Sequence, residues 1–259
     1  MTRPDPDVRR LASAPGRSAA EIEAKLDLRA RLAVEHLARL AAEGPERDCC
    51  LCGYRGRFSP VRAKPGIWCP SCDSRPRHRL FKLWLDRGGA AEIEGRRVLH
   101  FASEPVLTAV VQPLAGAYAT ADILPGHDLH LDMEAIDQPD GSWDVAIANH
   151  VLEHLDDRRA LAELHRVLAP GGLFLVTVPL VEGWAETLET PAWTSEEDRR
   201  AYYTDPLHLR FYGRDFRDRL AQAGFAVEDF TAVEPDVFRF GLQRGETLFV
   251  ARKTTRPEG

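Results

Sequence analysis

From residue 98 onward, short apolar runs alternate with stretches of helical periodicity, and this alternation limits the possible folds more than any other feature. It predicts a mostly parallel sheet of seven strands covered by helices, a doubly wound α/β domain at 95–253. In such sheets the ligand binds beyond the carboxyl ends of the strands. The expected strands are 97–102, 117–121, 128–131, 143–148, 172–178, 225–230 and 246–252, and the expected helices are 105–113, 157–168 and 213–223.

The long connection at 181–212 interrupts this rhythm, and we expect it to form a lid or substrate wall over the strand ends. Its aromatic side chains would enclose a compact acceptor; they include Trp184, Trp193, Tyr202 and Tyr203. The segment "DPLHLRFYG" places His208, Arg210 and Tyr212 at alternate positions, which share one face in an extended chain. Either these three side chains belong to the site, or they pack the lid onto the domain.

Four cysteines form two pairs with metal-site spacing, Cys49-x2-Cys52 and Cys69-x2-Cys72, separated by sixteen residues. The pattern predicts a closed four-thiolate zinc site that folds a small ribbon within 46–88 and performs no catalysis. Disulfides are the alternative, and a cytoplasmic location disfavours them. Cys50 does not fit the spacing, so we interpret it as a small side chain outside the metal site.

The ribbon segment is basic: residues 47–87 carry ten Lys or Arg against three Asp, while the whole chain has a net charge of −6. "RPRHRLFKLW" interleaves cations with aromatic rings, which is typical of nucleic-acid binding. The alternative is that a helix at 76–87 docks on the next domain through Leu80, Leu83 and Trp84. We favour docking, because the acidic remainder of the chain can neutralise the ribbon.

The first residues have no apolar periodicity, and 1–17 is expected to be a disordered tail rich in Pro and Arg. Ser18 and Glu21 form a capping-box pattern that starts an amphipathic helix at 18–44, for which packing on its own protein is favoured over a dimer contact. We find neither the apolar core of a signal peptide nor a run long enough for a membrane helix, and therefore expect a cytoplasmic protein that binds no membrane.

The series "VLHFASEP", "YATADIL", "DLHLDMEAID", "GSWDVAIANHVLEHLDD" and "ELHRVLAPGGLFLVTVP" resembles the class I S-adenosylmethionine-dependent methyltransferases over about residues 95–252. The cysteine pairs followed by "RPRHRL" further resemble a bacterial subgroup in which a zinc ribbon precedes this domain. The resemblance implies a Rossmann-like methyltransferase sheet that binds S-adenosylmethionine. The glycine-rich first turn of the family is missing here.

The resemblance places that first turn on residues 102–106, and His100, Ala102 and Glu104 would bind the cofactor there. The methionyl end of the cofactor carries an ammonium and a sulfonium group. Ala102 is small enough for close backbone approach if its dihedral angles are ordinary. Glu104 either pairs with the cofactor's ammonium group or caps the following helix.

The later strand ends carry the other residues that the resemblance implies. Asp122, followed by Ile123, would bind the ribose hydroxyls, and Asp132 with Met133 would bind adenine. Asn149 and His150 would lie under the methyl-transfer centre, with His208 or His150 as the general base.

Three functions remain open from the sequence. The first is methylation of O, N or C on a small metabolite, such as a natural product or a sugar-like acceptor. The second is an RNA methyltransferase that holds its substrate with the basic ribbon. The third is a cofactor-binding or interaction protein that has lost catalysis at its altered first turn. Neither the acceptor nor the oligomeric state follows from the residues.

Overall fold

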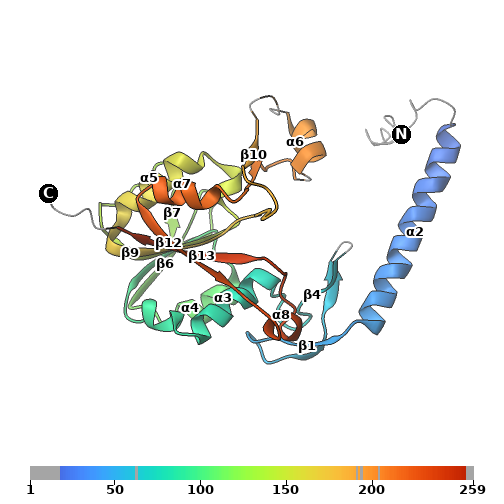
Figure 1. Cartoon of the computed structure of the whole chain (residues 1–259), viewed down its shortest axis with the longest axis horizontal. Helices are drawn as coiled ribbons and strands as arrows, with labels where there is room; N and C mark the ends of the chain where they lie inside the picture. The colour runs from blue at the N-terminus through green and yellow to red at the C-terminus, as the bar shows by residue number, and fades with distance from the viewer. Residues whose placement is uncertain (1–17, 62–63, 191, 193–194, 204, 255–259) are drawn as a thin grey trace.

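The computed structural model of the chain describes residues 18–254 except 62–63, 191, 193–194 and 204 (Figure 1). The segment 1–17 and Trp193, for which we stated expectations, lie outside the described residues. The helices are α2 (Ala19–Glu43), α3 (Pro76–Asp86), α4 (Pro105–Val111), α5 (Asp157–Val167), α6 (Glu196–Tyr203), α7 (Phe216–Gln222) and α8 (Asp236–Arg239), with 3-10 turns η1 (Gly89–Glu92) and η2 (Leu152–His154). The strands are β1 (Glu46–Asp48), β2 (Arg55–Arg57), β3 (Ser59–Val61), β4 (Lys64–Trp68), β5 (Arg97–Phe101), β6 (Ala117–Asp122), β7 (Leu129–His130), β8 (Trp143–Asn149), β9 (Leu168–Thr177), β10 (Leu188–Glu189), β11 (Arg210–Phe211), β12 (Phe225–Thr231) and β13 (Thr247–Lys253).

Seven of these strands form the predicted sheet, in the order β12-β13-β9-β8-β5-β6-β7. The five strands from β9 to β7 run parallel, and β13 is antiparallel to both of its neighbours. The strand order reverses between β5 and β8, whose register pairs Leu99 with Ala146. Such a reversal opens a crevice at the strand ends where α/β sheets bind ligands. The α/β fold class is confirmed.

Both faces of the sheet are covered, as Figure 1 shows, with α5 and α7 on one face and α3 and α4 on the other. On β5, Leu99 and Phe101 belong to one core cluster while Val98 belongs to the cluster on the opposite face. Strands buried on two faces explain why the apolar runs in this region are continuous and do not alternate with polar residues.

The ribbon consists of two short hairpins, β1 with β2 and β3 with β4, followed by α3. The apolar face of α3, including Leu80 and Trp84, joins the core cluster of Val98 on the sheet. Arg79 is fully buried, and its guanidinium joins the ribbon to the loop after α8. It donates hydrogen bonds to the carbonyl oxygens of Ile67, Ser74, Phe240 and Gly241.

Helix α2 starts at the expected capping box, in which Ser18 N–H donates to Glu21 Oε2 at 2.8 Å. It extends away from the sheet domain beside the β3–β4 hairpin (Figure 1). Leu28, Leu32 and Val34 remain at least half exposed along it. Among the described residues, none of the helices is long and apolar enough to cross a bilayer.

Candidate functional site

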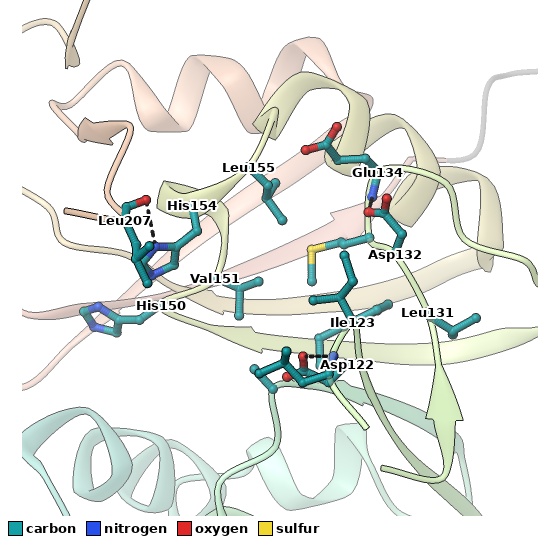
Figure 2. Close-up of a pocket in the computed structure, with 14 residues that line it drawn as sticks. Asp122, Ile123, Leu131, Asp132, Glu134, His150, Val151, His154, Leu155 and Leu207 are labelled. Atoms are coloured by element: carbon teal, nitrogen blue, oxygen red, sulfur yellow. Dashed lines mark hydrogen bonds between the residues drawn. The ribbon is translucent and has the colours of Figure 1, made fainter. Parts of the chain in front are cut away.

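A cavity of about 610 Å³ opens beyond the carboxyl ends of the parallel strands, and we call it the strand-end cavity. Figure 2 draws it with Asp122 and Asp132 on one side and His150 and His154 on the other. Its size suits a nucleotide-like ligand, because small-molecule pockets span roughly 300–1,000 Å³. Six of the residues expected at the cofactor site line it: Ala102, Asp122, Ile123, Asp132, Met133 and His150.

The first turn, between β5 and α4, bends at Ala102, whose φ of +46° lies in the left-handed region. We expected close backbone approach only if the dihedral angles of Ala102 were ordinary, and this condition is not met. An L-residue in this conformation costs roughly 1–2 kcal/mol, which is why glycine usually occupies such turns. Alanine is the next smallest residue after glycine, so the backbone can still approach a ligand closely. The turn is therefore built like a glycine turn, at the cost of strain.

The two acids at the strand ends are held in place by local backbone amides. Asp122 Oδ1 accepts from Leu124 N–H at 2.8 Å, and Asp132 Oδ1 accepts from Glu134 N–H at 2.8 Å. These are Asx-turn contacts, which fix the orientation of a carboxylate and leave acceptor capacity on it for a ligand. Met133 is buried beside them and supplies an apolar wall.

His100 and Asn149 were expected at the cofactor site, but neither lines the strand-end cavity. His100 is buried on β5, where its Nδ1 lies 2.7 Å from the hydroxyl of Tyr118 and burial lowers its pKa to about 4. Asn149 Oδ1 accepts a hydrogen bond from Thr177 Oγ1 at 3.0 Å. Both His100 and Asn149 lie within buried strands, where side chains alternate between the two faces of the sheet, and both are buried inside the domain.

Glu104 also departs from its expected role. Its side chain makes no capping hydrogen bond to α4 and does not line the cavity. Oε1 instead accepts from His78 Nε2 at 2.7 Å and from Arg77 Nε at 3.1 Å, both in the first turn of α3. Burial alone would raise the pKa of Glu104, but the His78 hydrogen bond and the Arg77 charge outweigh burial and lower it to about 2. The carboxylate thus anchors the ribbon helix.

A second cavity of about 400 Å³ lies between the lid and the loop before β13, and we call it the lid cavity. The lid supplies Val181, Glu182 and Phe211 to its wall, and the loop supplies residues 243–247. His150 lines both cavities, and its φ of +55° turns the chain sharply at the end of β8. Strained backbone of this kind is typical of functional positions.

Most of the lid does not behave as the sequence suggested. Tyr203 is buried, Trp184 and Tyr202 are exposed, and none of them lines either cavity. Arg210 donates to the carbonyl oxygens of Leu152 and Leu155, and the Tyr212 hydroxyl donates to the carbonyl oxygen of Leu152. These two side chains therefore fasten the lid to the domain, which was the alternative that we had left open.

His208 lies outside both cavities, so the geometry does not place it as a base at either one. Its ring packs edge-on against His154, with centroids 4.8 Å apart, and burial lowers its pKa. His154 lines the strand-end cavity, and beside it Glu153 is fully buried. Both residues belong to "LEHL", and we assigned no role to Glu153. Its sequence signal is weak, because a Glu at a helix start is usually exposed.

A family model described as "Methyltransferase domain" matches residues 31–229, which is more than half of the chain. The chain belongs to this methyltransferase family. The match includes the whole ribbon segment at 46–88 and every residue that lines the strand-end cavity.

Two curated relatives of this methyltransferase match over parts of their length. A protein of Mycolicibacterium smegmatis named "Probable S-adenosylmethionine-dependent methyltransferase" is 32% identical over 127 residues, which cover 48% of this chain and 43% of that protein. An "Uncharacterized 37.1 kDa protein in transposon TN4556" of Streptomyces fradiae is 31% identical over 137 residues, covering 51% and 39% respectively. The matched part thus spans about two fifths of the length of these relatives.

Among solved structures, the crystal structure of the [4+2]-cyclase SpnF aligns to the methyltransferase with a TM-score of 0.50 and 18% identity. The alignment covers 86% of this chain and 94% of that one. At this identity the likeness shows the fold alone, and a fold does not fix a reaction.

The Sγ atoms of the four ribbon cysteines lie within 4.8 Å of one another. Cys49 Sγ is 3.7 Å from Cys72 Sγ, and Cys52 Sγ is 3.7 Å from Cys69 Sγ. A disulfide requires about 2.05 Å, whereas sulfurs on a tetrahedral zinc with bonds of about 2.3 Å are roughly 3.8 Å apart. The donor set therefore fits zinc.

Proposed function

We propose that this chain transfers the methyl group of S-adenosylmethionine to a small organic acceptor. The observation that carries the proposal is the position of His150, which forms part of the wall of both cavities. A cofactor in one cavity and an acceptor in the other would meet at this residue. Methyl transfer needs such a meeting, because the donor carbon and the nucleophile must be aligned and close.

The strand-end cavity suits the cofactor through the chemistry of its wall. Asp122 and Asp132 would serve as acceptors for the ribose hydroxyls and the adenine amino group, and Met133 would pack against the ring. Ala102 allows the methionyl end to approach the backbone of the first turn. When bound, S-adenosylmethionine supplies a methyl group activated by its sulfonium charge. The residues of the chain have only to position it, to exclude water and to receive a proton.

The lid cavity suits a compact acceptor, because residues of both the lid and the domain enclose it and its volume is about 400 Å³. His150 is the residue best placed to take a proton from the acceptor. Its Nδ1 lies 3.2 Å from Glu153 Oε1, and a proton held on Nδ1 beside this carboxylate would leave Nε2 as the basic nitrogen. Glu153 would act as a positioning residue in the way that a buried carboxylate orients a catalytic imidazole.

A zinc ion held by Cys49, Cys52, Cys69 and Cys72 would be structural, since four thiolates leave no open position for substrate. Helix α3 begins shortly after Cys72 and packs on the sheet. Zinc would therefore stabilise the position of this helix and would take no part in methyl transfer.

The small acceptor is favoured over RNA because three cations of the ribbon and its helix are used within the protein. Arg77 pairs with Glu104, Arg79 is fully buried, and Arg87 pairs with Asp236. Charges in such contacts are unavailable to phosphates, on which nucleic-acid affinity depends.

Calorimetric titration of the full chain with S-adenosylmethionine and S-adenosylhomocysteine tests the proposal. We expect binding by the wild type and at least a tenfold loss of affinity in Asp122→Ala, since ribose hydroxyls lose a charged acceptor. The matched control is Asp144→Ala, which breaks a partly exposed ion pair with Arg97 at the far end of β8 and should keep the affinity. Absence of binding to either ligand would instead support a non-catalytic role.

A further inference from the structure

Glu153 is an unusual residue for its surroundings. It lies in the η2 turn with an exposed fraction of zero, and neither of its carboxylate oxygens has a hydrogen-bond partner among the described residues. Buried carboxylates are almost always paired with a cation or held by several donors, because removing the charge from water costs several kcal/mol. The one ion-pair contact that it makes among the described residues is with His150, whose Nδ1 lies 3.2 Å from Oε1. The second oxygen remains uncompensated.

Two further side chains that can ligate a metal ion lie close to Glu153. Glu153, His154 and His208 each offer one ligand atom, and these three atoms lie within 4.8 Å of one another. The Nδ1 of His208 is buried and, within the described part of the chain, has no hydrogen-bond partner. Buried polar atoms without partners, on two side chains that lie close together, point to a missing group between them.

The remaining histidine is already oriented for this purpose. The Nδ1 of His154 lies 3.2 Å from the carbonyl oxygen of Leu207 (dashed in Figure 2), so Nδ1 carries the proton and Nε2 presents its lone pair. Metal-binding histidines typically use the other ring nitrogen in this way, because the outer hydrogen bond fixes both tautomer and orientation.

We propose that Glu153, His154 and His208 bind a divalent transition-metal ion at the wall of the strand-end cavity. Two imidazoles and one carboxylate form the ligand set that zinc, iron(II), manganese(II) and cobalt(II) accept in open sites. Ligand atoms on a tetrahedral ion are roughly 3.4 Å apart, so a set that is now within 4.8 Å must contract by about 1.4 Å at most.

The ion would keep at least one open coordination position. Since His154 lines the strand-end cavity, that position faces the space where ligands enter. Water or an oxygen of a bound acceptor would complete the coordination. The ion would also balance the charge of Glu153, which makes no ion pair with a lysine or an arginine among the described residues.

Elemental analysis of the full chain, purified without chelator and dialysed against metal-free buffer, tests the site without cofactor or acceptor. Its result is therefore independent of the proposed function. We expect two metal equivalents per chain, one in the thiolate ribbon and one here. Glu153→Gln and His208→Gln should each lower the content to one equivalent, while His36→Gln, on the exposed face of α2, should keep two.

Titration of the metal-depleted chain with Co²⁺ separates the two sites by their spectra. Cobalt on four thiolates gives intense near-ultraviolet charge-transfer bands, whereas cobalt on two imidazoles and a carboxylate gives only weak visible bands. We expect the weak bands to disappear in Glu153→Gln while the thiolate bands persist. One equivalent in the wild type together with no weak-band species would overturn the proposal, whether or not the variants fold, and would leave protonated His150 as the counter-ion of Glu153.

Discussion

The Nε2 of His78 lies 2.7 Å from Oε1 of Glu104, and this contact joins the first turn of α3 to the first turn of α4. The backbone N–H of Arg75 donates to Nδ1 of His78, so the ring presents an Nε2–H to the carboxylate while it is neutral. Burial lowers the pKa of His78, which favours the same neutral form. The contact thereby fixes α3 to Glu104, which lies two residues after the strained Ala102 in the cavity wall.

Glu104→Gln should lower stability at neutral pH and flatten its acid dependence. Because its pKa is lowered to about 2 in the folded chain, the Glu104 carboxylate contributes stability above about pH 4.5. That contribution is lost as the pH falls from there toward 2, and is on the order of 3 kcal/mol in full. Urea unfolding between pH 7 and pH 3 measures it as a difference between variant and wild type.

Acid also removes metal from thiolates, and this effect is common to wild type and variant, so only the difference between their pH curves is informative. Glu23→Gln, on the exposed surface of α2, should reproduce the wild-type curve. Parallel curves for Glu104→Gln and the wild type would show that the ion pair does not contribute in solution.

Ala102→Gly should stabilise the protein by about 0.5–1 kcal/mol, because glycine adopts a φ of +46° without strain and this gain exceeds its entropy cost. Cofactor affinity should remain within about twofold. The same substitution at Ala109, exposed in the middle of α4, should instead destabilise by about 1 kcal/mol. Chemical denaturation measures the change in the free energy of unfolding for both variants. A change of the same sign in both would contradict a strained turn at Ala102.

Cys69→Ser should release the ribbon zinc and lower the unfolding temperature by roughly 10 °C or more, since zinc sites contribute folding energy directly. Cys50→Ser is the matched control, because burial raises the pKa of the Cys50 thiol to about 12 and its sulfur is not among the four clustered donors. Scanning calorimetry with metal analysis measures both. A Cys69→Ser chain that melts like the wild type would exclude a structural zinc.

Affinity for RNA should be weak and should fall steeply with salt, as expected when only exposed cations of the ribbon contact phosphates. Arg55 is such a residue, with 79% of its side chain exposed, and Arg55→Glu should weaken this binding further without affecting cofactor affinity. Filter binding over a salt series measures the effect. Tight, sequence-selective binding at physiological salt would instead support an RNA substrate.

The alternation of apolar runs predicted the seven strands of the sheet to within a few residues, and the cysteine spacing predicted the cluster of Cys49, Cys52, Cys69 and Cys72. Both are local properties of the chain. Apolar periodicity determines which segments can be buried in a sheet, and two residues between cysteines are enough to form one metal-binding turn. Asp122 and Asp132 reached the strand-end cavity because the carboxyl ends of parallel strands meet at the same edge of the sheet.

Tertiary structure alone decided the partners of the buried charged and polar groups. Glu104 meets His78 across 26 residues, and Glu153 lies beside His208 across 55, because packing of α3 and of the lid on the sheet brings them together. The backbone conformation at Ala102 was decided in the same way, since the neighbouring strand holds its N–H on the carbonyl oxygen of Ala121. Local pattern contains no information on such contacts, because their energy arises only when distant segments have excluded water between them.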